Sequence, residues 1–145
     1  MSRSKAPLPL DIKKKQQEIS KRSLKHYPVP STKEKIEVEG VKKLLRAAEL
    51  PWVLRHPTTG LRLEINELIH PKIVYLLSMG DYEQDDLNLI QKHIQKGDRV
   101  LELGAGIGIT AVLASLISKN KVIVVEANKN LKKLLEVQAK LNRAK

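Results

Sequence analysis

The sequence predicts an α/β protein whose central unit is a strand, a helix and a second strand in parallel. Three observations support this. A short apolar segment at 99–103 runs into glycines at alternate positions. Apolar residues then recur at helical spacing from Ile109, and a second apolar segment follows at 121–125. Parallel strands joined by a right-handed helical crossover imply a three-layer α/β sheet.

The turn after the first strand contains Gly104, Gly106 and Gly108. Glycine tolerates a positive φ and places no Cβ between the backbone and a ligand. The following helix would direct its free N–H groups toward this turn. Three alternate glycines favour close approach of a ligand, with a simple tight turn as the alternative.

Upstream of this unit the pattern predicts a helix over 37–50, ended by Pro51. Two short alternating segments, 52–55 and 61–65, predict a β-hairpin. In the second of them, Leu61, Leu63 and Ile65 would share one face. Residues 71–79 predict a short helix that begins at Pro71 and ends before Gly80, with a strand as the alternative.

A further helix is expected from Asp85-Asp86, with Leu87, Ile90 and Ile94 on one face. The last helix is expected over 128–142. The chain therefore divides into three parts. These are a basic tail at 1–35, expected to be disordered, a helix, hairpin and short helix at 36–80, and the α/β unit at 81–145.

Residues 1–35 carry ten Lys and Arg against three acidic residues, a net charge of +7 out of +11 for the chain. Such an arm could contact nucleic acid, but a solvated tail is the favoured interpretation. Its only aromatic residue is Tyr27, so it lacks the stacking surface of a single-strand binder. The segment 13–25 could form a polar helix that is too poor in apolar residues to dock firmly.

Composition excludes several classes of site. The chain has no cysteine, which excludes disulfides, thiolate metal sites and cysteine nucleophiles. The four histidines, His26, His56, His70 and His93, show no spacing with carboxylates that would indicate a metal, and a surface role is expected for them. No apolar run is long enough to span a bilayer and no secretory signal is present, so a cytoplasmic location is expected by default.

The second strand ends in Glu126, 22 residues beyond Gly104. An acidic residue at this place can accept hydrogen bonds from both ribose hydroxyls of an adenosine cofactor. Its alternative role is to stabilise the first turn of the last helix. A dinucleotide site requires a third glycine where this chain has Ile109, which argues against a nucleotide-dependent oxidoreductase.

With Glu102 two residues ahead of the first glycine, the pattern is E-x-G-x-G-x-G. It resembles the first motif of class I S-adenosylmethionine-dependent methyltransferases. The wider run is similar to the FkbM family, on Tyr82-Glu83, residues 97–108 and residues 122–128. The resemblance covers roughly residues 80–142. It implies a Rossmann-like three-layer methyltransferase fold.

The same resemblance implies a set of cofactor contacts for S-adenosylmethionine. Glu102 would order the turn and reach the amino group of the cofactor, unless it is an exposed charge at the strand end. Thr110 would bond toward the methionine carboxylate or serve only the first helical turn. The implied set is Glu102, Gly104, Ala105, Gly106, Gly108, Glu126, Ala127 and Asn128, with Tyr82 and Glu83 as a covering segment or a plain loop.

Class I methyltransferases have a seven-stranded sheet, of which this sequence supplies two strands. Two strands alone would leave open edges. We therefore expect the N-terminal part of a longer gene product, or a truncated reading frame. The resemblance implies O-methylation of a small molecule or sugar hydroxyl. The alternative is a non-catalytic module whose basic arm contacts nucleic acid. No catalytic base or metal ligand can be chosen, and no oligomeric state follows.

Overall fold

The computed structural model describes residues 31–145. Nearly all the described residues belong to one compact unit, residues 35–145, which we call the second unit. The first described helix, α2 (Thr32–Ala47), begins earlier than the expected helix and ends before Pro51. Residues 32–35, which the sequence predicts to belong to the tail, form the first turn of α2. The expected polar helix at 13–25 lies outside the described residues.

The predicted hairpin is confirmed. Strand β1 (Trp52–Arg55) pairs antiparallel with β2 (Arg62–Ile65), with Trp52 opposite Ile65. The loop closes with a 2.8 Å bond from the His56 N–H to the Leu61 carbonyl oxygen. Leu61, Leu63 and Ile65 are all buried, as their alternation predicts.

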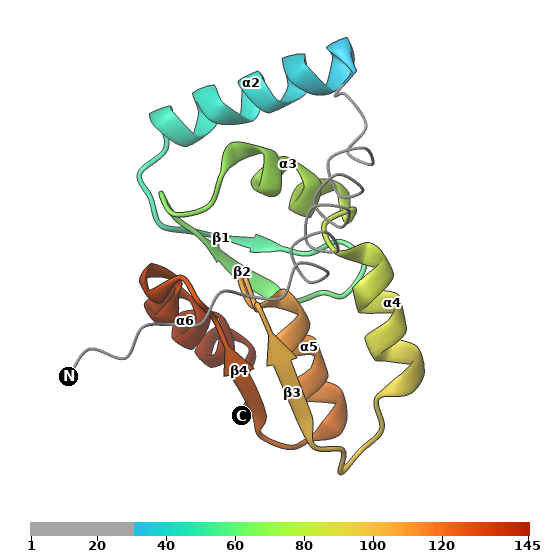
Figure 1. The fold of residues 1–145 in the computed structure, drawn as a ribbon. Coiled ribbons are helices and arrows are strands. Elements are labelled where there is room, and N and C mark those ends of the chain that lie inside the picture. The colour runs from blue at the N-terminus through green and yellow to red at the C-terminus, as the bar shows by residue number, and fades with distance from the viewer. Residues whose placement is uncertain (1–30) are drawn as a thin grey trace, which may run out of the picture. The chain divides into compact units, whose positions relative to one another are not determined.

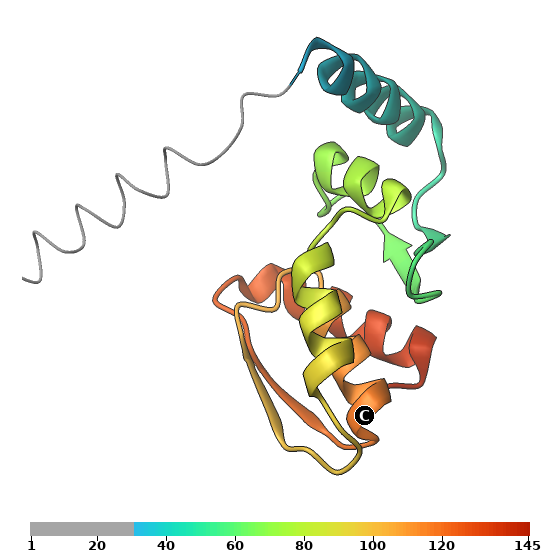
Figure 2. The same cartoon turned by 90° about the vertical axis from the view of Figure 1, so that its right-hand side faces the viewer.

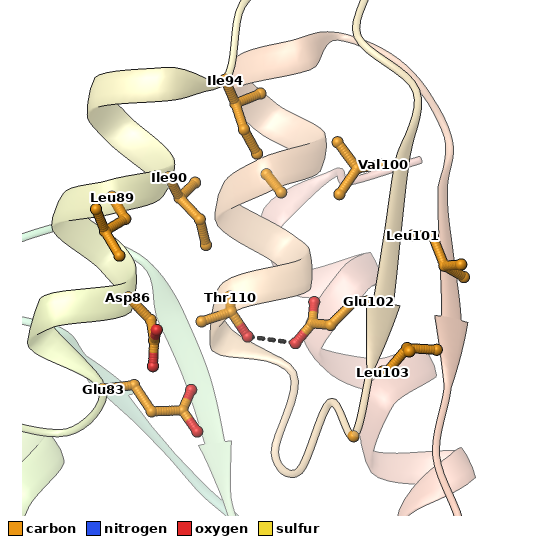
Figure 3. Close-up of a pocket in the computed structure, with 12 residues that line it drawn as sticks. Glu83, Asp86, Leu89, Ile90, Ile94, Val100, Leu101, Glu102, Leu103 and Thr110 are labelled. Carbon is orange, nitrogen blue, oxygen red and sulfur yellow. Dashed lines mark hydrogen bonds between the residues drawn. The ribbon is translucent and has the colours of Figure 1, made fainter.

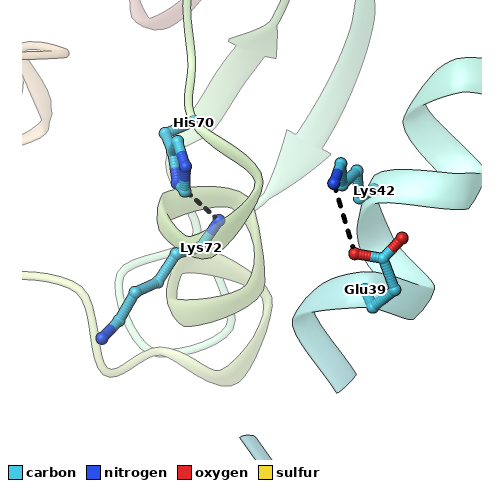
Figure 4. A network of polar contacts seen from close by, with 4 residues as sticks. All are labelled: Glu39, Lys42, His70 and Lys72. Carbon is cyan, nitrogen blue, oxygen red and sulfur yellow. Dashed lines mark hydrogen bonds and ion pairs between the residues drawn. The ribbon is translucent and has the colours of Figure 1, made fainter. Parts of the chain in front are cut away.

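The next two helices have well-defined ends. Helix α3 (Pro71–Met79) has Pro in its first turn and ends at Gly80, whose φ is 82°. The His70 ring accepts a 3.2 Å hydrogen bond from the Lys72 N–H and so caps the helix (Figure 4). Helix α4 (Gln84–His93) follows after a turn.

The expected β-α-β-α unit is present. Strand β3 (Val100–Leu103), helix α5 (Ile109–Ser118) and strand β4 (Val122–Val125) follow in order. Strands β3 and β4 are parallel, with Val100 opposite Val122. A short 3-10 turn, η1 (Lys129–Leu131), leads into α6 (Lys132–Asn142). Helices α4, α5 and α6 lie to one side of the strand pair (Figures 1 and 2).

The core of the second unit is aliphatic and joins the hairpin, α3, α4, α5 and α6. Its buried members come from every one of these elements. They are Leu61, Leu63, Ile65, Ile69, Val74, Leu77, Leu87, Ile107, Ile109, Val112, Leu113 and Leu134. No helix between residues 31 and 145 combines the length and apolarity that crossing a bilayer requires.

The β3–β4 pair is covered on one face only. Leu101 and Leu103 are 60% and 73% exposed, and Ile123 and Val125 are 60% and 51% exposed. Parallel sheets are normally covered on both faces. Within the described residues this sheet has two strands, so both of its outer edges are free of a further strand.

The outer edge of β2 is closed by two side-chain amides of α6. Gln138, fully buried, accepts from the Glu64 N–H at 2.8 Å and donates to the Glu64 carbonyl oxygen at 3.0 Å. Asn142, one helical turn later, accepts from the Arg62 N–H at 2.9 Å and donates to its carbonyl oxygen at 2.7 Å. Each amide thus replaces one residue of a neighbouring strand, and together they fix the hairpin to α6.

His56 is buried, which corrects the expectation of a surface histidine. Its Nδ1 lies 3.0 Å from the Thr59 hydroxyl, whereas its buried Nε2 has no hydrogen-bond partner among the described residues. Burial lowers the pKa of His56 below its usual value because the charged ring would lose its hydration. The loop beside His56 contacts a distant segment, with a 3.2 Å hydrogen bond from the Thr58 hydroxyl to the Gln84 side-chain oxygen, and sequence periodicity does not reveal such contacts.

We predict that Gln138→Leu lowers the free energy of unfolding by about 1–3 kcal/mol, because the Glu64 N–H and C=O lose their partners in a partly buried place. Urea unfolding followed by circular dichroism measures this. Lys140→Leu, an exposed position on the same helix, is the control and should change stability by less than about 0.5 kcal/mol. Equal effects of the two substitutions would contradict the role given to Gln138.

We also predict that His56 makes the protein less stable in mild acid. A lowered native pKa means that the unfolded chain binds the proton more readily. The neutral ring's contribution is therefore complete above the unfolded pKa of about 6.5 and is lost as the pH falls toward the native pKa. The difference in unfolding free energy between pH 7.5 and 5.5 should shrink in His56→Gln. An unchanged difference would show that other groups cause the acid sensitivity.

Candidate functional site

The glycine turn connects β3 to α5 and adopts a conformation that favours glycine throughout. The φ values of Gly104, Gly106 and Gly108 are 82°, 51° and 85°. The Gly104 N–H donates to the Val125 carbonyl oxygen at 2.7 Å, which extends the β3–β4 ladder into the turn. The Gly108 N–H donates to the Ala105 carbonyl oxygen at 2.8 Å. The turn is therefore fixed at both ends.

Two of the three glycines serve clearly different purposes. A Cβ at Gly108 would lie 2.5 Å from Leu135 Cδ2, so this glycine allows α6 to pack against the turn. A Cβ at Gly104 would meet nothing within 4 Å, and Gly104 is exposed. Gly104 thus leaves an open backbone surface on which a ligand can lie. The simple tight turn explains Gly108 but not the free space beside Gly104.

Glu126 lies at the carboxyl end of β4. Its side chain forms hydrogen bonds to the glycine turn after β3 and to the segment after β4. Its Oε2 accepts from the Gly106 N–H at 2.9 Å, and its Oε1 accepts from the Asn128 N–H at 2.7 Å. Both bonds lower the pKa of the Glu126 carboxyl, and the bond from Asn128 has the larger effect. The group is accessible to solvent, so an ionised acceptor bonded to the turn is open to other donors.

Glu102 is half-buried and does not behave as an exposed charge at a strand end. Its Oε1 accepts a 2.5 Å hydrogen bond from the Thr110 hydroxyl, which is buried in the first turn of α5. Burial raises the pKa of Glu102, and the Asp86 charge adds to this, whereas the Thr110 bond acts in the opposite direction. The threonine therefore serves the carboxylate of the preceding strand.

A cavity of about 400 Å³ lies between α4 and β3, beside the turn. Figure 3 shows the Glu83, Asp86 and Glu102 side chains near one another at its polar end, where Thr110 bonds Glu102. The remaining lining is mostly aliphatic, from Leu89, Ile90, Ile94, Val100, Leu101, Leu103, Gly104 and Ala114. The cavity combines an apolar wall with a strongly acidic end.

Tyr82 and Glu83 lie next to the turn, as a covering segment would require. A Cβ at Gly106 would come within 3.6 Å of the Tyr82 hydroxyl oxygen. Glu83 has a φ of 52° and stands immediately before α4. Burial raises the pKa of Tyr82, with the adjacent Glu83 carboxylate adding to it. Burial also raises the pKa of Glu83, and Glu102 and Asp86 add to it, although the Tyr82 hydroxyl opposes them.

The other predicted residues occupy less informative positions. Ala105 is buried beneath the turn, so its methyl group does not face a ligand. Ala127 and Asn128 are exposed, and the Asn128 side chain accepts from the Asn130 N–H at the start of η1.

Sequence reasoning missed Asp86, which lines the acidic end of the cavity. Its spacing from Glu83 by three residues, at the start of a predicted helix, was the available signal.

The site residues fit a nucleoside with a charged amino-acid end better than they fit a metal. Between residues 31 and 145 no three His, Asp or Glu side chains form a group that could hold a metal ion. An open glycine backbone, an ionised Glu126 and a half-buried carboxylate at Glu102 offer acceptors for hydroxyl and ammonium groups. These are the polar groups that S-adenosylmethionine carries.

Comparison with known families supports this assignment. Residues 82–144 match the family described as Protein-L-isoaspartate(D-aspartate) O-methyltransferase (PCMT). The match indicates a class I S-adenosylmethionine-dependent methyltransferase and supports a Rossmann-like fold, but it does not indicate the FkbM family specifically. No solved structure gives a significant match. The matched segment begins at Tyr82 and contains every residue of the proposed cofactor set.

We predict that Gly108→Ala lowers the free energy of unfolding by about 1–2 kcal/mol or more, because alanine is strained at a φ of 85° and its Cβ would collide with Leu135. Gly40→Ala is a matched control within α2, where a Cβ meets nothing within 4 Å. It should stabilise the protein by roughly 0.5–1 kcal/mol. Thermal unfolding measures both, and a neutral Gly108→Ala would contradict the close contact between the turn and α6.

Proposed function

We propose that this chain binds S-adenosylmethionine at the glycine turn and directs its methyl group to an oxygen nucleophile. The observation that carries the proposal is the position of Glu126. Its ionised carboxylate stands at the carboxyl end of β4, bonded to the same turn whose first glycine leaves open backbone. The match of residues 82–144 to a methyltransferase family supports a methyl donor over a dinucleotide.

In this proposal each part of the ligand has its own contact. Glu126 would accept hydrogen bonds from the ribose hydroxyls, and the exposed Ala127 and Asn128 would lie beside the adenine edge. Glu102, oriented by Thr110, would face the amino group of the methionine end. The backbone at Gly104 and Ala105 would lie beneath that end, and Tyr82 and Glu83 would cover it.

S-adenosylmethionine supplies an activated methyl group on a sulfonium. The acceptor oxygen forms a bond to the methyl carbon while the carbon–sulfur bond breaks, leaving a neutral thioether. A hydroxyl acceptor also loses its proton to a base. The protein's part is alignment of the two reacting groups, which can account for several kcal/mol of the barrier. The turn, fixed by the Gly104 and Gly108 bonds, provides a rigid support for that alignment.

The acidic end of the cavity favours a hydroxyl acceptor, as in FkbM-like small-molecule or sugar methylation. The matched family's name specifies an isoaspartate of a protein, which presents a carboxylate. Glu102 and Glu83 are assigned to the cationic amino end of the methyl donor, and Asp86, the remaining acid at this end of the cavity, would repel such an anion at close range. A neutral hydroxyl avoids this repulsion. We therefore propose a hydroxyl on a neutral small molecule or sugar as the acceptor.

We predict that the purified chain binds S-adenosylhomocysteine and that Glu126→Ala weakens this binding on the order of tenfold or more, because hydrogen bonds to a charged acceptor are lost. Calorimetric titration measures both, with NADH as the ligand control and Glu49→Ala, an exposed acid outside the site, as the matched variant. NADH binding as tight as that of S-adenosylhomocysteine, or no binding by a chain that circular dichroism shows to be folded, would contradict the proposal.

A further inference from the structure

Glu126 is already engaged before any ligand is present. One carboxylate oxygen holds the Gly106 N–H at 2.9 Å, and the other holds the Asn128 N–H at 2.7 Å. These two amides belong to the turns that follow two neighbouring strands. A single side chain therefore joins the glycine turn to the start of the segment that leads into η1 and α6.

The Gly106 bond is the only hydrogen bond that fixes the middle of the turn in the described structure. The two ends of the turn are held by backbone partners, Val125 for Gly104 and Ala105 for Gly108. Gly106 lies between them with a φ of 51°. A Cβ added at this residue would lie 3.6 Å from the Tyr82 hydroxyl oxygen. The direction of the Gly106 peptide therefore depends on a side chain from another strand.

A carboxylate has more acceptor positions than these two amides use. An ionised carboxyl group offers about four lone-pair positions, so two of them are free for other donors. Glu126 can thus hold the turn and receive hydroxyl groups at the same time.

We propose that Glu126 is a positioning residue for the glycine turn, fixing the Gly106 peptide in the ligand-free protein, in addition to receiving the ribose hydroxyls. The part of this inference that concerns the ribose hydroxyls rests on the proposed function. The positioning role itself is a property of the ligand-free chain. Its consequence is that Glu126 contributes to the binding of the amino-acid end of the ligand, which it does not touch.

The first test uses no ligand. Hydrogen exchange of the ¹⁵N-labelled chain reports the protection of the Gly106 amide. We expect exchange at Gly106 to be about tenfold faster or more in Glu126→Ala, since the hydrogen bond is lost. Glu126→Gln retains one acceptor oxygen for two donors and should be intermediate. The Gly104 amide, bonded to the Val125 backbone, and the Glu49→Ala variant are the controls and should not change.

The second test separates positioning from ribose contact. S-adenosylhomocysteine and its 2′,3′-dideoxy analogue are titrated into the wild type and into Glu126→Ala. A residue that acted only through the ribose hydroxyls would show no penalty with the analogue. We expect a residual loss of severalfold with the analogue, because the turn beneath the homocysteine end is no longer fixed.

Unchanged Gly106 exchange in Glu126→Ala overturns the positioning role. So does a penalty that vanishes with the dideoxy analogue. If the wild type binds neither nucleoside, the proposed function fails, but the exchange experiment still decides whether Glu126 fixes the turn. If Glu126→Ala does not fold, Glu126→Gln supplies both measurements.

Discussion

The parallel pairing of β3 with β4 is the constraint on which the site depends. It brings the carboxyl ends of the two strands side by side, with Leu103 opposite Val125. The ladder continues through the 2.7 Å bond between the Gly104 N–H and the Val125 carbonyl oxygen. Only because the strands are aligned in this register does Glu126 reach the amide of Gly106, 20 residues earlier in the chain. The crossover helix α5 connects β3 to β4 and accounts for most of this separation in sequence.

Local signals were enough to predict most elements and the centre of the site. Pro71 and Gly80 mark the two ends of α3, and short apolar runs mark β3 and β4. Each of these signals lies within the element it defines, so no knowledge of distant contacts is needed. The same holds for the glycine turn and for Glu126, because strand-end geometry places them together once the strands are parallel.

The features that were not predicted depend on contacts between distant segments. His56 is buried although the loop residues that follow it are largely exposed, and its neighbours in sequence do not indicate this. Gln138 and Asn142 are polar residues on an amphipathic helix, and only the presence of β2 gives them partners. The sequence pattern carries little information about the acceptor for a related reason: in the proposed function, the residues of the E-x-G-x-G-x-G motif are assigned to the methyl donor and not to a second substrate.

The two amide pairs between α6 and β2 also determine how the chain must fold. They join residues 74 and 80 positions apart, whereas β3, α5 and β4 are neighbours in sequence. Contacts that close long loops carry a larger entropic cost and form late. We therefore expect the local β-α-β segment to form before the contacts between α6 and the hairpin. Residues 82–144, the segment that matches a methyltransferase family, contain Gln138 and Asn142 but not Glu64 and Arg62, the hairpin residues whose backbone groups these two side chains bond.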